Sequence, residues 1–276
     1  MHFPVYIHIG PWTLPPHPVF ESLAYFIGAR LYFFNARRSK PIPFDQGVWV
    51  LVGAVVGAAT GAKILSWLEN PIALIHNWSN PTYWIGGETI VGGLLGGLVG
   101  VEVAKKCVGW KQSTGDSFVL PLIVGMCIGR VGCFLAGLPD HTYGTPTHFV
   151  TGVDFGDGVR RHPTQLYEIA FLIVLGMFLW IFSRWNRSRF PWKLTNAVQV
   201  DGDNRRFPPG TYFQMFMAAY LGFRLLIEFI KPTPHVYFGF SNIQLACIAG
   251  LGYYIPKLCV TLTYGAKWRM EVKHAQ

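Results

Sequence analysis

Long apolar runs recur along the whole chain, and they constrain the fold more than any other feature. A transmembrane helix needs about 20 consecutive, mostly apolar residues, and the chain contains a series of runs of about this length. The last run contains Pro256, which predicts that its helix kinks or ends there. We therefore expect an all-α, polytopic membrane bundle of about seven transmembrane helices, near residues 19–34, 47–67, 86–104, 118–138, 164–182, 212–230 and 241–260.

The composition agrees with a membrane protein. Only 13% of the residues are charged and 51% are hydrophobic, whereas soluble domains average about 25% charged residues. We interpret the whole chain, residues 1–276, as one integral-membrane domain. The five cysteines lie in or beside apolar runs, without the paired spacing of disulfide frameworks or zinc sites. We expect them to pack between helices, and we expect no metal and no cofactor.

The basic residues are concentrated in alternate connections between the predicted spans. The positive-inside rule then places the N-terminus outside and the C-terminus in the cytoplasm. Because topology accounts for the net charge of +9, nucleic-acid binding is not expected. The long outer stretches, residues 70–84 and 139–163, are expected to form a small periplasmic cap. The basic connections contain Arg37, Arg38, Lys40, Lys105, Lys106, Lys111, Arg184, Arg187, Arg189, Lys193, Arg205, Arg206, Lys257, Lys267, Arg269 and Lys273.

Ionisable side chains also occur inside the predicted spans. Arg130 interrupts an apolar, glycine-rich run, and an arginine at membrane depth costs about 2.5–3.5 kcal/mol on insertion scales, so it indicates a functional site. Arg224 and Glu228 stand four residues apart and share one helix face, with Tyr220 one turn earlier. Lys63, Glu88 and Glu168 are further ionisable residues within these spans.

Two interpretations of these buried charges remain open. They either form ion pairs that hold helices together, or they bind an anionic ligand. Guanidinium groups match the geometry of a phosphate, and the simplest phosphate reached from within a membrane is a phospholipid headgroup. The sequence therefore predicts a helical bundle that binds a lipid phosphate.

Glycines and histidines give weaker signals. Gly92, Gly96 and Gly100 follow each other at four-residue intervals, which favours close helix packing. Gly92 and Gly93 would alternatively let a lipid headgroup approach the backbone. His141 and His162 lie in or beside the predicted outer stretch, and each is compatible with a loop role or with proton transfer.

Several segments together resemble the prolipoprotein diacylglyceryl transferase family. They are GRVGCFLAG at residues 129–137, YGTPT at 143–147, HPTQLYE at 162–168 and YLGFRLLIEF at 220–229. The resemblance runs from the first predicted span to the seventh. It implies a bacterial inner-membrane enzyme with seven spans. Such an enzyme moves the diacylglyceryl group of phosphatidylglycerol onto the lipobox cysteine of a preprolipoprotein and releases glycerol 1-phosphate.

The resemblance also implies roles for individual residues. Positions of this sequence that match the family pattern are expected to bind the lipid or to take part in catalysis. They are Asp116, Arg130, Gly144, His162, Gln165, Tyr167, Glu168, Tyr220, Arg224 and Glu228.

Five positions depart from the family pattern. Val91 stands where the family has a histidine, and valine cannot accept the proton of a thiol. We expect Glu88, or His141 or Asp140 from a loop about three residues longer than in the family, to act instead. Lys63 and Cys133 are still expected at the lipid site. These departures leave two alternative functions open. The protein could use the same lipid donor with another acceptor, or it could bind phospholipid without catalysis. The remaining substitutions are Cys133 for asparagine, Leu138 for glutamate, Lys63 for arginine and Glu21 for tyrosine.

Overall fold

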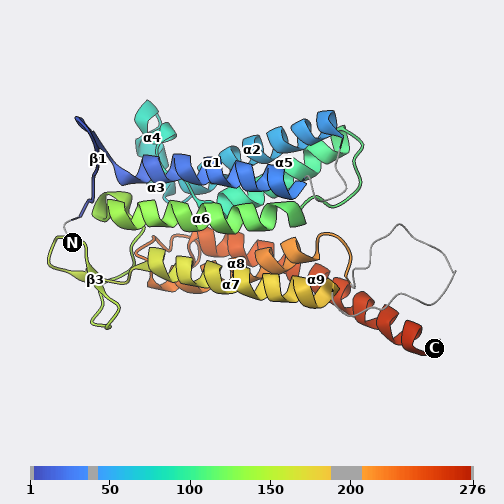
Figure 1. Ribbon diagram of the computed structural model, residues 1–276. Helices are drawn as coiled ribbons and strands as arrows, with labels where there is room; N and C mark the ends of the chain where they lie inside the picture. The colour runs from blue at the N-terminus through green and yellow to red at the C-terminus, as the bar shows by residue number, and fades with distance from the viewer. Residues whose placement is uncertain (1–2, 37–42, 188–206, 275–276) are drawn as a thin grey trace.

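Long helices lie side by side in the computed structural model, which describes residues 3–36, 43–187 and 207–274 (Figure 1). Each apolar run named above falls on one of these helices, with end points shifted by a few residues. The helices are α1 (Pro16–Ala36), α2 (Phe44–Trp67), α5 (Ile90–Cys107), α6 (Asp116–Ala136), α7 (Thr164–Arg187), α8 (Thr211–Ile227) and α9 (Asn242–His274).

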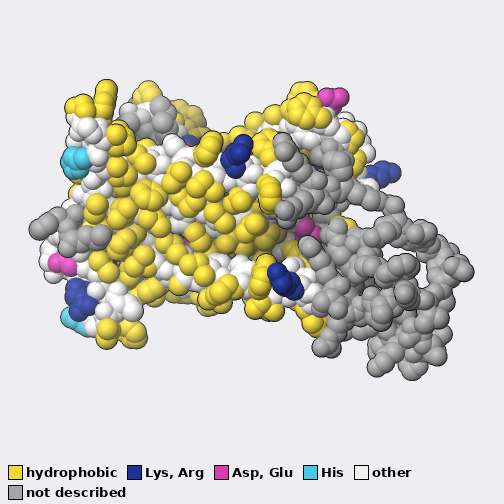
Figure 2. All heavy atoms as spheres, in the orientation of Figure 1, with side chains coloured by type: hydrophobic (Ala, Val, Ile, Leu, Met, Phe, Trp, Pro, Cys, Tyr) yellow, Lys and Arg dark blue, Asp and Glu magenta, His cyan; other side chains and the backbone are white. Residues whose placement is uncertain are grey.

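Five of these helices, α2, α6, α7, α8 and α9, are long and apolar enough to cross a membrane. Helix α5 is not among them, because three charged residues, Glu102, Lys105 and Lys106, lie within its 18 residues. Hydrophobic side chains cover most of the visible face between the two ends of the bundle (Figure 2). A helical membrane protein is therefore supported.

Some end points and loop positions differ from the sequence prediction. Helix α9 continues through Pro256 to His274, so of the two expected outcomes, a kink or an end, the end is excluded. One proline removes a single backbone donor, and the bonds of the flanking turns remain. Arg184 and Lys257 lie within helices α7 and α9 and not in connections. The basic residues Arg37, Arg38, Lys40, Arg189, Lys193, Arg205 and Arg206 lie outside the described residues.

Short elements gather at the end of the bundle where the N-terminus lies (Figure 1). They include the hairpin of β1 (Ile7–Ile9) and β2 (Trp12–Leu14), the helices α3 (Pro71–His76) and α4 (Pro81–Ile85), and the pair of β3 (Val153–Asp154) and β4 (Arg160–Arg161). The cap is therefore not purely helical, which corrects the all-α prediction. A glycine- and aspartate-rich turn joins β3 to β4, in which Asp154 Oδ1 accepts hydrogen bonds from the amides of Gly156 and Gly158.

Helices α2 and α5 approach each other closely through glycines. A Cβ atom added to Gly57 would lie 2.9 Å from the Cα atom of Gly100, and one added to Gly96 would lie 2.8 Å from the Cα atom of Gly61. No side chain fits at such distances, so only glycine permits this contact. The predicted packing role of the glycine run is confirmed.

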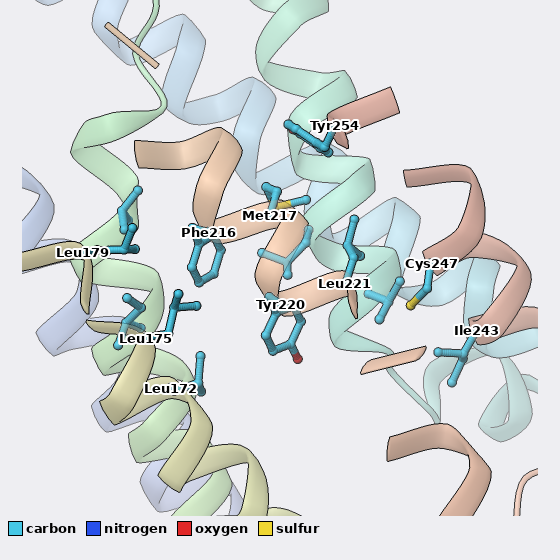
Figure 3. Packing of buried hydrophobic residues seen from close by; sticks show 14 residues of the cluster. Leu172, Leu175, Leu179, Phe216, Met217, Tyr220, Leu221, Ile243, Cys247 and Tyr254 are labelled. Carbon is cyan, nitrogen blue, oxygen red and sulfur yellow. The ribbon is translucent and has the colours of Figure 1, made fainter. Parts of the chain in front are cut away.

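Helix α8 lies at the centre of the hydrophobic core. Phe216, Met217, Tyr220 and Leu221 of this helix are fully buried against residues of α7 and α9 (Figure 3). The spacing of these residues defines one helix face, and the same face continues to Arg224. The periodicity that buries the apolar residues therefore also places a charged side chain in the interior. The labelled partners are Leu172, Leu175, Leu179, Ile243, Cys247 and Tyr254.

Candidate active site

Two arginines and two glutamates meet inside the bundle, and we call this group the arginine clamp: Arg130, Glu168, Arg224 and Glu228. Arg130 Nε of α6 lies 2.8 Å from Glu168 Oε2 of α7, and Arg224 Nη1 of α8 lies 3.6 Å from the same oxygen. Arg224 Nη2 donates to Glu228 Oε2 at 3.3 Å. All four residues are at most 6% exposed. The structure thus brings together charges that are far apart in the sequence.

Neighbouring hydroxyl groups fix the two carboxylates of the clamp. The Tyr220 hydroxyl donates to Glu168 Oε1 at 2.7 Å. Glu228, at the start of the 3-10 turn η2 (Glu228–Ile230), accepts from Thr233 Oγ1 at 2.6 Å and from Ser241 Oγ at 3.4 Å. The sequence analysis missed Thr233 and Ser241 because a single hydroxyl residue in a connection carries no signal of its own.

The charges of the clamp are balanced, because Arg130 and Arg224 are each paired with a glutamate. Two donors nevertheless remain unused, since Nε and Nη1 of Arg224 are buried without a hydrogen-bond partner among the described residues. Buried donors of this kind are costly unless an acceptor reaches them.

Lys231 adds a further cation beside the clamp, directly after η2. Burial and the nearby charges of Arg224 and Arg130 lower the pKa of Lys231 from 10.5 to about 7. No pattern in the sequence indicated a role for this residue.

A second polar group touches the clamp through Arg130. Arg130 Nη1 donates to Cys133 Sγ at 3.6 Å, and Cys133 Sγ lies 3.8 Å from His17 Nδ1 of α1. The same His17 nitrogen contacts Asp140 Oδ1 in the 3-10 turn η1 (Leu138–Asp140). Burial would raise the pKa of Asp140, but hydrogen bonds with His17 and Thr142 lower it below its usual range. His17 was not predicted, because a histidine between prolines before a helix has no motif.

The HPTQLYE segment mainly positions the loop beside the clamp. Gln165 Nε2 donates to Thr142 Oγ1 at 2.9 Å, and the Tyr167 hydroxyl lies 3.1 Å from His162 Nδ1. Only Glu168 of this segment reaches the arginines. Gly144 donates its amide to the His162 carbonyl, and a Cβ at Gly144 would lie 2.7 Å from the Ile230 carbonyl oxygen. The requirement for glycine there is thus explained by backbone packing.

Asp116, which the resemblance assigns to the lipid site, lies far from the clamp. Its carboxylate accepts from the amides of Gly210 at 2.7 Å and Phe213 at 3.1 Å, at the N-terminus of α8. Arg224 is 14 residues further along this helix, a distance of about 20 Å at a rise of 1.5 Å per residue. A carboxylate at a helix N-terminus satisfies unpaired amides and the helix dipole, and this is the role that Asp116 has here.

The other predicted residues also contact groups outside the clamp. Lys63 Nζ lies 3.1 Å from Glu88 Oε1, and the Glu88 side chain is 55% exposed. Gly92 packs against Gly61, and Gly93 faces α2, so both glycines contribute to the contact between α2 and α5. His141 is exposed and adopts a left-handed backbone conformation with φ of 52°. Val91, which replaces the family histidine, is buried in the hydrophobic core.

Comparison with known proteins agrees with this geometry. The family model described as prolipoprotein diacylglyceryl transferase matches residues 4–260. A phosphatidylglycerol–prolipoprotein diacylglyceryl transferase from Bordetella bronchiseptica is 29% identical over 253 residues, which cover 84% of this chain and 83% of the relative. The protein of the same name from Cupriavidus metallidurans is 29% identical over 267 residues, covering 88% of this chain and 85% of the relative. This chain belongs to the prolipoprotein diacylglyceryl transferase family.

Proposed function

We propose that this protein transfers the diacylglyceryl group of phosphatidylglycerol to the lipobox cysteine thiol of a prolipoprotein and releases glycerol 1-phosphate. The family assignment and the names of the relatives support this reaction. The structural observation that supports it most is the buried Arg224, whose Nε and Nη1 groups make no hydrogen bond to the described residues, although Nη1 lies 3.6 Å from Glu168 Oε2. A phosphate oxygen is the acceptor that suits a guanidinium best.

The clamp suits the leaving group of this reaction. Negative charge grows on the phosphate oxygen as the bond to the diacylglyceryl carbon breaks, and fixed donors in a buried site stabilise such charge strongly. Arg130 and Arg224 supply those donors. Glu168 and Glu228 hold the two guanidinium groups in place, and Tyr220, through its hydrogen bond to Glu168, is a positioning residue.

The orientation in the membrane follows from the distribution of charge. In our proposal the chain crosses the bacterial inner membrane seven times, and α1 and α5 span it in addition to the five helices that are long and apolar enough by length and composition. The N-terminus lies outside, and the cap that contains β1, β3, α3 and α4 is periplasmic. The exported acceptor then meets the lipid at the outer half of the bundle.

The departures from the family pattern are compatible with two alternative functions. Val91 removes the family histidine, so the acceptor would differ if this chain had no other means of activating a lipobox thiol. A protein that only binds phospholipid is the second alternative, although four buried charges are an expensive feature for a passive binder.

One assay separates the proposal from its alternatives. The purified protein is incubated with phosphatidylglycerol labelled in its acyl chains and with a lipobox peptide, or with the same peptide carrying serine in place of cysteine. We expect label on the cysteine peptide only. Lipid turnover without labelled peptide would indicate another acceptor, and binding without turnover would indicate a non-catalytic protein. Arg130→Ala should abolish transfer, while Arg30→Ala, at an exposed position of α1, should not.

A further inference from the structure

Three side chains that are distant in the sequence converge beside the clamp and present the ligand types that zinc prefers. Ligand atoms of His17, Cys133 and Asp140 all lie within 4.8 Å of one another. The distance from Cys133 Sγ to His17 Nδ1 is 3.8 Å. Ligands at about 2.0–2.3 Å from a tetrahedral zinc ion lie about 3.3–3.7 Å from each other. His17 Nδ1 and Asp140 Oδ1 are in direct contact, so these two side chains would have to move apart for the three ligands to surround one ion.

Each of these three side chains also lies near a further polar or charged side chain. Metal ligands are usually oriented by hydrogen bonds from a surrounding layer of polar groups. Thr142 Oγ1 donates to the Asp140 oxygen that faces away from His17, at 2.6 Å. The other ring nitrogen of His17, Nε2, lies 3.8 Å from Glu21 Oε2. Arg130 Nη1 donates to Cys133 Sγ.

Charge and exposure match a zinc site with an open position. One thiolate and one carboxylate neutralise a divalent ion, and three protein ligands leave the fourth position of a tetrahedron for a substrate or water. The side chain of Asp140 is 7% exposed and that of His17 is 43% exposed, so the group is accessible from the side of α1.

We infer that His17, Cys133 and Asp140 bind a zinc ion whose open position takes the thiol of the acceptor cysteine. This inference rests on the proposed function. It assigns thiol activation to a metal in a chain that has Val91 where the family has a proton-accepting histidine. Because the Arg130 guanidinium contacts both Glu168 and Cys133, a thiol held by the metal lies next to the lipid phosphate held by the clamp.

The chemical step balances without any further reactant. The acceptor thiol replaces a zinc-bound hydroxide and transfers its proton to it, so water leaves and a zinc-bound thiolate remains. A sulfur lone pair attacks the diacylglyceryl carbon bonded to the phosphate oxygen, and a carbon–sulfur bond forms. The carbon–oxygen bond breaks, and its electron pair stays on glycerol phosphate beside Arg130 and Arg224. The product thioether carries no charge and therefore leaves the zinc easily.

Metal content gives the first test. The full chain, purified without a histidine tag, should contain about one zinc per protein by mass spectrometry of the elements. Stripping with a chelator and adding Co²⁺ should produce a thiolate-to-cobalt charge-transfer band. Cys133→Ser should remove this band and lower the metal affinity at least 100-fold, and Glu21→Gln should lower the affinity about 10- to 100-fold. The control variants Cys259→Ser and His148→Gln, at exposed positions, should keep the charge-transfer band and the metal affinity of the unmodified protein. A band that survives Cys133→Ser would overturn the inference.

Binding of the acceptor peptide should change the Co²⁺ spectrum if the metal activates the thiol. A metal with a purely structural role would give no such change. Adding the lipobox cysteine peptide to the Co²⁺ protein should strengthen the charge-transfer band, because a second thiolate enters the coordination sphere. The serine peptide should leave the band unchanged. An identical spectrum with and without the cysteine peptide would rule out thiol activation by the metal.

The inference and the proposed function fail in different ways. Transfer of lipid to the peptide by metal-free protein at the full rate would refute the zinc inference and leave the function intact. A Co²⁺ spectrum that responds to the peptide, together with no transfer from phosphatidylglycerol, would support the metal site and refute the proposed lipid donor.

Discussion

Arg130 and Glu168 approach each other from two helices, with Arg130 Nε 2.8 Å from Glu168 Oε2. Arg224 reaches the same carboxylate oxygen at 3.6 Å. One carboxylate therefore lies between two buried guanidinium groups, and its removal would leave both cations facing each other in the bundle interior.

Replacing Glu168 by glutamine should destabilise the protein strongly. Removing one partner of a buried ion pair costs about 3–5 kcal/mol. The measurement is thermal unfolding of the purified protein in detergent, followed by tryptophan fluorescence. Glu88→Gln is the matched control, because the exposed Lys63–Glu88 pair should contribute at most about 1 kcal/mol. Equal melting shifts for the two variants would contradict the assigned burial of the clamp.

The same Glu88→Gln variant tests the proton acceptor predicted from the sequence. Glu88 is paired with Lys63 and largely exposed, so we expect transfer to the lipobox peptide to change by less than about threefold, well under 1 kcal/mol in the barrier. Initial rates with labelled phosphatidylglycerol give the answer. A loss of transfer in a variant that unfolds at the usual temperature would restore Glu88 as the base.

The contact between α2 and α5 should not tolerate a methyl group. A Cβ at Gly96 would lie 2.8 Å from the Cα atom of Gly61, so Gly96→Ala should force the helices apart and cost about 1–3 kcal/mol, as overpacking does. Gly252→Ala in α9 meets no atom within 4 Å and should not destabilise the protein. The measurement is the melting temperature of the Gly96→Ala and Gly252→Ala variants. Similar values for the two would contradict the close contact between α2 and α5.

Lipid binding should depend on pH through Lys231. The pKa of Lys231 is lowered to about 7 by burial and by Arg224 and Arg130, and a bound phosphate diester favours the protonated amine. Affinity for short-chain phosphatidylglycerol should therefore be highest below pH 7 and should fall as the pH rises above 7, while the charge of the lipid stays constant. The Lys231→Gln variant should bind short-chain phosphatidylglycerol with an affinity that depends little on pH between pH 6 and 8.5. The slope of affinity against pH in both proteins is the measurement.

The sequence predicted those parts of the structure that depend on local patterns. Apolar runs located the long helices because a helix needs only its own residues to satisfy its backbone. The four-residue spacing of Arg224 and Glu228 predicted their pairing for the same reason. Glycine spacing likewise predicted the close approach of α2 and α5.

Contacts between distant segments were not predictable in this way. His17 precedes Cys133 by 116 residues, and only the packing of α1 against α6 brings them together. Asp116 was assigned to the lipid site by resemblance, whereas the structure places it at the N-terminus of α8. The balance of charge in the clamp depends on which helices face each other. Local sequence patterns do not predict these helix–helix contacts.

The affinity for phosphatidylglycerol tests the clamp most directly. Binding of short-chain phosphatidylglycerol and of uncharged short-chain diacylglycerol is measured for the unmodified protein, for Arg224→Gln and for the exposed control Arg30→Gln. Because hydrogen bonds to charged groups contribute about 1.5–3 kcal/mol, we predict that Arg224→Gln weakens phosphatidylglycerol binding at least about tenfold. Diacylglycerol binding should stay the same in all three proteins. Undiminished affinity of Arg224→Gln for phosphatidylglycerol would contradict the account.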